Sequence, residues 1–289
     1  MKALVAAVLA CVAPLAQAAE PGSRWYLQVD NDLVFGTDRG YSSGLRLGRV
    51  SGVGDIRVEW GVLQEVYSPE GKYWAPGKDD RAPAARLLAY GARHRLTPSL
   101  HETLELAIGV RGPSALGEQV TDIAHKWADA ANVDWSREES DQVDVQAVAV
   151  RSHAIGNFHL HYGAVAGNHL AFGHGGVEWR HGTGAAVAAL SPLLRYAATP
   201  PPPSSVPPGW AVFAGAGVRA IARNATIERN YDPFGPELKP RRAVGRAAAG
   251  VAWVGAWGSL TFALAVDTRE FAAQREPQAF GSLTVHVGF

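Results

Sequence analysis

The 289-residue chain has little cysteine, no excess of either charge and few long hydrophobic runs. Its single cysteine, Cys11, lies in an apolar N-terminal run, so the rest of the chain has neither a disulfide framework nor a thiolate metal site. Its 27 basic and 27 acidic residues leave no net charge, which argues against a nucleic-acid partner because phosphate binding needs clustered positive charge. Beyond the N-terminal run, no segment has the uninterrupted apolar length of a spanning helix. Membrane entry would therefore require a closed β-barrel, in which all backbone groups are paired.

The N-terminus has the pattern of a cleaved signal peptide. Met1-Lys2-Ala3 is a short basic region, an apolar run continues to Leu15, and small residues follow up to Ala19. The apolar run is short for a membrane anchor, which needs about 20 residues. Residues 8–11 match a lipoprotein processing box only faintly. We therefore expect a signal peptide over residues 1–19 and one domain over residues 20–289, exported from the cell interior.

Short stretches of alternating apolar and polar residues recur along the chain. In the last ten residues, Leu283, Val285, Val287 and Phe289 alternate with Ser282, Thr284, His286 and Gly288, and residues 103–111 and 259–267 alternate in the same way. Such segments are typical of strands with one face on lipid and the other on a barrel lumen, and a terminal aromatic residue is typical of bacterial outer-membrane barrels. In residues 158–166, the same pattern predicts that His159 and His161 point inward.

The pattern predicts an all-β fold, an antiparallel transmembrane β-barrel of about twelve strands with a short helix in a long loop. A soluble β-sandwich or barrel also alternates and is the rival interpretation. The export signal, the aromatic terminus and the number of strands favour the membrane barrel. The expected strands lie near residues 24–31, 41–51, 54–67, 85–97, 101–112, 140–153, 157–169, 182–195, 208–221, 242–254, 258–270 and 280–289.

Two segments break the alternation. Residues 114–128 carry apolar side chains at near-helical spacing, with Ser114 as the expected N-cap and with His125 on the face opposite Val120, Ile123 and Trp127. Residues 200–208 contain six prolines, which cannot hold a strand ladder and predict a stiff, exposed connection.

The segment from Val29 to Gly44 places acids, an amide and hydroxyls between two alternating runs. Asn31 and Asp32 offer the hard oxygen ligands that calcium prefers, although a turn rich in Asn and Asp would have the same composition. Adjacent residues of a strand face opposite sides, so both serve one site only if the strand ends or bulges there.

Further along the chain, four residues are candidates for chemistry or, equally, for ordinary surface positions. Ser42 begins a strand, His125 lies on the expected helix with Asp122 one turn earlier, and Lys72 and Lys78 lie in a turn-rich loop. A zinc site is a weaker alternative, because no spacing among five further histidines matches a ligand motif; these are His159, His161, His169, His174 and His181.

Taken together, these residues resemble a known family. Six segments match, in the same order, the outer-membrane lipid A 3-O-deacylases of the LpxR type; they are Val29–Asp32, Asp38–Leu45, Tyr67–Pro69, Asp80–Arg81, Gly112–Ala115 and Gln119–His125. The matches cover about the first half of the mature chain. The second half matches only as barrel strands.

The resemblance implies a calcium-dependent hydrolase in the bacterial outer membrane that removes the 3′-linked acyloxyacyl group of lipid A. It places Asn31 and Asp32 at the family's Asn-Asp pair, which would also hold the metal. It places Ser42 at the family's threonine position, His125 at its catalytic histidine, and Lys72 at its site lysine, with Lys78 as a competitor. Either a water activated by His125 or the Ser42 hydroxyl is the nucleophile.

The expected partners are lipid A or lipopolysaccharide and the outer-membrane lipids, with no nucleic acid, and the protein is expected to be a monomer. Two other functions remain open from the sequence. One is a non-catalytic barrel that serves as a pore or scaffold, and the other is an outer-membrane phospholipase that uses the same ester chemistry.

Overall fold

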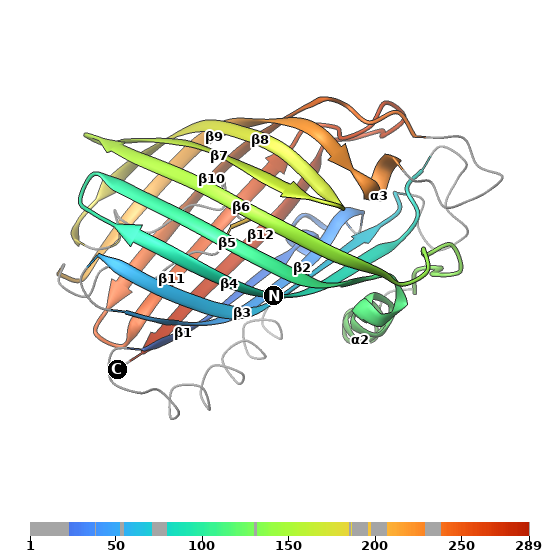
Figure 1. Cartoon of the computed structure of the whole chain (residues 1–289), viewed down its shortest axis with the longest axis horizontal. Helices are drawn as coiled ribbons and strands as arrows, with labels where there is room; N and C mark the ends of the chain where they lie inside the picture. The colour runs from blue at the N-terminus through green and yellow to red at the C-terminus, as the bar shows by residue number, and fades with distance from the viewer. Residues whose placement is uncertain are drawn as a thin grey trace.

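The computed structural model describes residues 23–37, 39–52, 55–70, 80–129, 132–184, 186, 196–197, 207–228 and 238–288. These residues form twelve antiparallel strands that close into one barrel, in which each strand pairs with its neighbours in sequence and β1 pairs with β12 (Figure 1). The predicted barrel is confirmed. The strands are β1 (Arg24–Asn31), β2 (Gly40–Ser51), β3 (Ile56–Ser68), β4 (Ala84–Leu96), β5 (Leu100–Arg111), β6 (Gln142–Ile155), β7 (Phe158–Gly167), β8 (Leu170–Gly182), β9 (Gly209–Asn224), β10 (Ala243–Gly255), β11 (Gly258–Asp267) and β12 (Gln278–Gly288).

The two ends of the barrel differ. The loop end, at the right of Figure 1, carries the short helices η1 (Asp32–Phe35), η2 (Pro113–Ala115), α2 (Gly117–Ala128) and α3 (Ala225–Glu228). The opposite end, here called the turn end, holds the start of β1, the end of β12 and tight turns such as the one between β6 and β7. Among the described helices, none is long and apolar enough to cross a membrane.

Side chains alternate between an apolar outer wall and a polar lumen. On β5, Leu104, Leu106 and Ile108 are 57%, 71% and 60% exposed, whereas Glu105 and Arg111 are buried inside. The same holds on β11, and His161 on β7 points inward as predicted. An outer wall of exposed leucine, isoleucine and valine is the surface that lipid solvates.

Ion pairs cross the lumen. Arg46 donates to both carboxylate oxygens of Glu105, at 2.9 and 3.3 Å, and Arg86 lies 3.1 Å from Asp144 and 3.5 Å from Glu65. All five side chains are buried. Since a buried charge is tolerated only when it is paired, these contacts explain how a narrow lumen accommodates so many ionisable residues.

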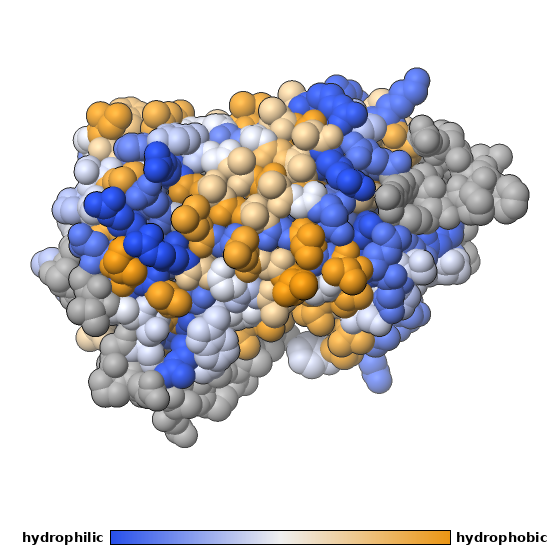
Figure 2. All heavy atoms as spheres, in the orientation of Figure 1, coloured by the Kyte–Doolittle hydropathy of each residue, from blue (hydrophilic) through white to orange (hydrophobic). Residues whose placement is uncertain are grey.

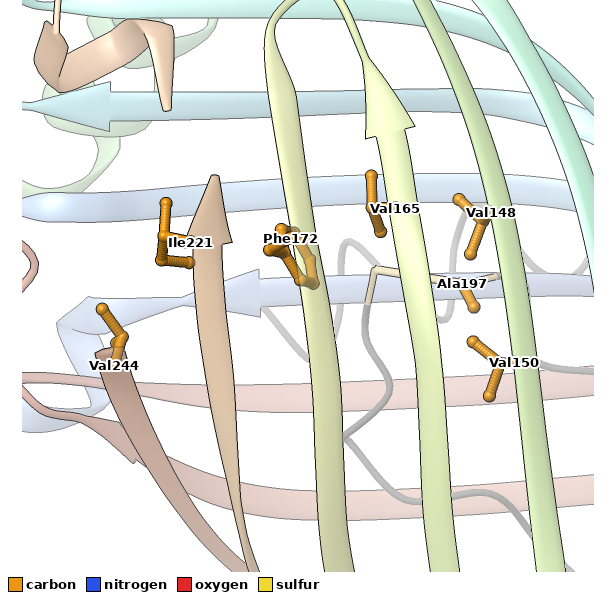
Figure 3. Packing of buried hydrophobic residues seen from close by; sticks show 7 residues of the cluster. All are labelled: Val148, Val150, Val165, Phe172, Ala197, Ile221 and Val244. Carbon is orange, nitrogen blue, oxygen red and sulfur yellow. The ribbon is translucent and has the colours of Figure 1, made fainter. Parts of the chain in front are cut away.

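An apolar cluster fills another part of the lumen. It combines Val148, Val150, Val165, Phe172, Ile221 and Val244 of β6–β10 with Ala197 of the β8–β9 connection (Figure 3). The ring of the neighbouring Tyr196 lies 5.1 Å from that of Phe172. The described part of this connection therefore packs inside the barrel. Pro207 and Pro208 are exposed and outside any strand, as expected, and the rest of the proline run lies outside the described residues.

One predicted strand is wrong. The eighth strand occupies Leu170–Gly182 rather than 182–195, and Thr183, Gly184 and Ala186 lie outside any strand. The outward positions of β8 include Gly173 and Gly175, while Glu178 and Arg180 point inward. Because the outer face lacks large apolar side chains over half its length, hydrophobic alternation does not reveal this strand.

Tryptophans form a belt on the outer wall at the turn end. Trp25 and Trp60 stack edge to face at 6.0 Å, and Trp253 lies 5.2 Å from Trp257. Trp179 and Trp210 continue the belt around the wall and are 38% and 49% exposed. Such a girdle is typical of the interface between membrane and water, and it sets the depth of the barrel.

Candidate active site

β1 ends between the two residues of the Asn-Asp pair. The side-chain oxygen of Asn31 accepts a hydrogen bond from the Leu33 backbone N–H at 2.8 Å and so caps η1. Asp32 is buried, and its Oδ2 accepts from the Arg39 backbone N–H at 2.8 Å and from the Thr37 hydroxyl at 3.3 Å. The change from strand to helix breaks the alternation, which allows the two neighbouring side chains to face one cavity.

A β-bulge gives Ser42 its position. Tyr41 pairs with Tyr67 and Ser43 pairs with Val66, so Ser42 is an extra residue in β2. The Tyr41 hydroxyl donates to Asp30 inside the barrel, at 2.8 Å. The Ser42 hydroxyl instead lies 3.3 Å from the Val66 carbonyl, to which it donates, and 3.0 Å from Ser68 Oγ, on the outer face of β3. The bulge therefore turns Ser42 toward the outer wall.

Helix α2 lies against the outer wall at the loop end and carries His125, which is 4% exposed. Gln64 of β3 donates to the Ala115 carbonyl at 2.7 Å just before the helix begins. A side chain at Gly117 would meet Ala85 and Trp135 at 2.5 Å, so glycine lets the helix start close to the barrel. Ile123 and Trp127 are exposed on the side of the helix away from His125.

Two expectations about this helix are wrong. Ser114 is not the N-cap, because η2 intervenes and the cap residue is Leu116, which makes no side-chain cap bond. Ser114 instead donates through its backbone N–H, at 2.8 Å, and through its hydroxyl to Asp141, and these bonds lower the pKa of that carboxyl. Val120 lies on the same side of the helix as His125 rather than opposite it, since both line one cavity.

That cavity is the candidate active site. It has a volume of about 220 Å³ and lies between α2 and the outer faces of β1, β2 and β3. It brings together four of the five predicted site residues, Asn31, Asp32, Ser42 and His125. Lys72, the fifth, and its competitor Lys78 lie outside the described residues. The catalytic and metal-binding roles of all five remain predictions.

Other residues line this cavity that the sequence did not single out. Gln64, Ser43 and Thr121 add an amide and two hydroxyls to it. Gln64 had a signal in the sequence, because it interrupts the outward series Val58, Trp60 and Val62 on β3 with a polar residue. A polar residue on a lipid-facing wall marks either a covered position or a functional one, and Gln64 lies under the helix.

The donors present agree in kind with a calcium ion. Asn31 and Asp32 supply an amide and a carboxylate oxygen, the hard ligands that calcium takes in sets of about six to eight, so backbone carbonyls, water or substrate would complete the shell. Among the described residues, no group of three or more histidine, cysteine or acidic residues could hold a metal ion, so a metal here would take most of its ligands from amides, backbone carbonyls, water or substrate. The zinc interpretation gains no support.

A closed barrel with an apolar wall, an aromatic belt and a polar cavity on its outer face defines an integral membrane barrel built around a lipid-facing site. Among known proteins, the family model for outer membrane protein LpxR matches residues 3–289, and the chain belongs to this family. The resemblance in the sequence is thereby confirmed, and with it an outer-membrane location. No curated protein matches the chain.

A solved structure of the same family has the same fold. LpxR from Salmonella typhimurium superposes with a TM-score of 0.78 at 22% identity, covering 92% of this chain and 100% of that one. The translocator domain of the autotransporter NalP from Neisseria meningitidis has a TM-score of 0.35 at 12% identity, covering 100% of this chain and 96% of that one.

Proposed function

We propose that this protein hydrolyses the 3′-linked acyloxyacyl ester of lipid A in the outer membrane, with calcium held by Asn31 and Asp32. The main observation behind the proposal is the location of the cavity on the barrel. It lies on the outer wall at the loop end, where a lipid ester reaches it from the side without entering the lumen. Its lining also contains the groups that ester hydrolysis needs.

The residues divide the work as follows. His125 accepts a proton from water, and the hydroxide so formed adds to the acyl carbonyl carbon. The tetrahedral intermediate collapses, the bond from the carbonyl carbon to the sugar oxygen breaks, and the imidazolium returns the proton to that oxygen. The products are a fatty acid and the 3′-hydroxyl of the sugar. Calcium, when bound by Asn31 and Asp32, would supply positive charge that stabilises the developing oxyanion.

Ser42 has a supporting role in this scheme. Its hydroxyl is oriented by Val66 and Ser68 on the neighbouring strand. With these partners, Ser42 is better placed to position water or substrate than to act as a nucleophile that an imidazole activates. Lys72 is assigned, by the family resemblance alone, to binding a phosphate or the oxyanion.

The test is hydrolysis by the purified full-length protein in detergent with calcium. Mass spectrometry of purified lipid A should show loss of the 3′-linked acyloxyacyl mass, and a chelator should prevent it. The His125→Ala variant should lose activity by about 10²- to 10⁴-fold while still migrating as a folded barrel. If that variant still released the acyl group at the wild-type rate, His125 could not be the general base.

The other functions predict other outcomes of the same test. Fatty acid released from phosphatidylethanolamine, with lipid A intact, would identify a phospholipase. If the folded protein changes neither lipid in the presence of calcium, the result would favour a non-catalytic pore or scaffold. The ion pairs and the apolar cluster that fill the lumen speak against a wide pore.

A further inference from the structure

A second groove lies on the outer wall, toward the turn end and away from the candidate active site. It has a volume of about 580 Å³ and runs across β4 to β8. Sites for lipid- or drug-sized ligands in proteins have roughly 300–1,000 Å³, so the groove has the size of a ligand site. None of its lining residues belongs to the active-site cavity.

The strand register arranges the outward-facing part of its lining in two rows, and the row between them, from Thr103 to His174, faces the lumen. In one row, Arg93, Leu104, Ala149, Ala164 and Gly173 are consecutive cross-strand partners on β4 to β8. In the next outward-facing row toward the turn end, the partners are Arg95, Glu102, Arg151, Tyr162 and Gly175, of which Glu102, Arg151 and Tyr162 line the groove. The four other residues of the first row give the groove an apolar floor, and Arg93 together with the second row gives it a charged border.

The charged border interrupts the tryptophan belt. β4, β5 and β6 contain no tryptophan, and toward the turn end their outer face has three arginines and one glutamate, a local charge of +2; these are Arg93, Arg95, Arg151 and Glu102. Figure 2 shows the corresponding hydrophilic patch at the left, beside the apolar middle of the same face. A net positive patch at the level of the lipid headgroups attracts an anionic lipid.

Two of the arginines pair with an acid and are nevertheless exposed. Glu102 lies 2.7 Å from Arg151 and 3.7 Å from Arg95, and the side chains of these arginines are 58% and 53% exposed. Among the described residues, Arg93 has no hydrogen-bonding or ionic partner, and it is exposed at the edge of the groove. Guanidinium groups bind phosphate oxygens in pairs and are preferred over ammonium groups for this role.

We propose that this groove binds an anionic glycerophospholipid, with Arg93 and Arg151 on the phosphate and one acyl chain on Leu104, Ala149 and Ala164. Short turns of outer-membrane barrels face the periplasm, so this lipid lies in the opposite leaflet from the loop-end cavity. Its binding does not depend on the function proposed for that cavity.

The experiment is native mass spectrometry of the full-length protein in detergent. Phosphatidylglycerol and phosphatidylcholine with identical acyl chains are added at equal concentration. Phosphatidylglycerol should be retained preferentially, and the double variant Arg93→Gln/Arg151→Gln should lose this retention by about tenfold to thirtyfold. Arg242→Gln is the matched control, because Arg242 is 65% exposed, has one acid partner and lies at the loop end; it should bind as the wild type does.

Two further variants keep the test decisive. Glu102→Gln removes the competing acid and should strengthen phosphatidylglycerol binding. Gly173→Leu should weaken binding of both lipids without disturbing the barrel, since a Cβ atom at the exposed Gly173 meets nothing within 4 Å and the rest of the side chain extends into the groove. Equal retention of the two lipids, unchanged binding by the double variant, or displacement by inorganic phosphate alone would overturn the proposal.

Discussion

The polar residues inside the barrel and those of the outer-wall cavity are held in different ways. Inside, Arg46 and Arg86 reach across the lumen to carboxylates on other strands. In the outer cavity, Asn31, Asp32 and Ser42 are oriented by backbone groups of Leu33, Arg39 and Val66. Lumen polarity therefore links strands and stabilises the barrel, whereas cavity polarity is fixed in direction and presented to a ligand. Variants in the two regions should accordingly change different measurements.

The largest expected effect is on stability, from Arg46→Met. This change leaves Glu105 buried without its arginine and removes the guanidinium that lies 4.4 Å from the Tyr90 ring. The cost should be about 3–5 kcal/mol in the free energy of unfolding, measured by urea titration in detergent. Hydrolytic activity per folded molecule should stay at the wild-type level. The double variant Arg46→Met/Glu105→Gln should recover most of the stability. If the double variant were stable but inactive, the lumen ion pair would also serve the outer cavity, which contradicts the division between the two regions.

Asp32→Asn should lower the hydrolytic activity while leaving the stability of the barrel unchanged. The amide oxygen still accepts from the Arg39 N–H, so the turn is kept, but the negative charge that favours calcium is lost. Activity should fall by about a hundredfold, as changes around metal ligands commonly cause. Added calcium should restore part of it in a titration of rate against ion concentration. Full activity in the presence of chelator would contradict the assignment.

Ser42→Ala separates the two chemical routes. If the serine only positions water or substrate, its loss should lower the rate by about tenfold, the value of one hydrogen bond. If it is the nucleophile, activity should fall by a thousandfold or more, and the wild type should accumulate an acyl-enzyme visible by mass spectrometry. We expect the smaller loss and no acyl-enzyme.

The smallest effect concerns the loop that carries α2. Partial burial, with Glu118, Asp141 and Glu139 nearby, raises the pKa of Glu138 to about 7 from the usual 4.5. Between these two values the folded state binds the extra proton, so stability falls as the pH rises from about 4.5 to 7. Because Glu138 is partly exposed, the change should stay below about 1 kcal/mol.

Hydrogen exchange of α2 is the measurement for this effect. Protection of the helix amides should decline between pH 5 and 8 beyond the intrinsic pH dependence of exchange, as Glu138 ionises next to Glu118 of the helix. Glu138→Gln should remove that decline. A decline that persists in the variant would assign the effect to another group.

The sequence predicted the barrel because eleven of its strands show an apolar outer face or a closely similar alternation. It missed β8, whose outer face contains Gly173 and Gly175 and whose charged residues are inside. Lumen ion pairs such as Arg46–Glu105 join residues 59 positions apart, and nothing local in the sequence specifies such a pairing. Packing across the barrel decides it.

The candidate site shows the same limit. Residue type and the order of the family segments were enough to select Asn31, Asp32 and His125. They did not show that all three face the outer side of the barrel wall rather than the lumen. That side depends on where β1 ends and on the extra residue in β2, and single-sequence boundaries are uncertain by a few positions. Gln64 shows that a polar residue in an outward apolar series was the stronger local signal.

Because of the bulge at Ser42, the outer-wall cavity depends on the number of residues in β2 as well as on their identity. Deletion of the Tyr41 codon would restore simple alternation and turn Ser42 to the inside of the barrel, while every other side chain of the cavity kept its identity. Short deletions in this strand, as well as substitutions, are therefore expected to remove the proposed activity in relatives of this protein.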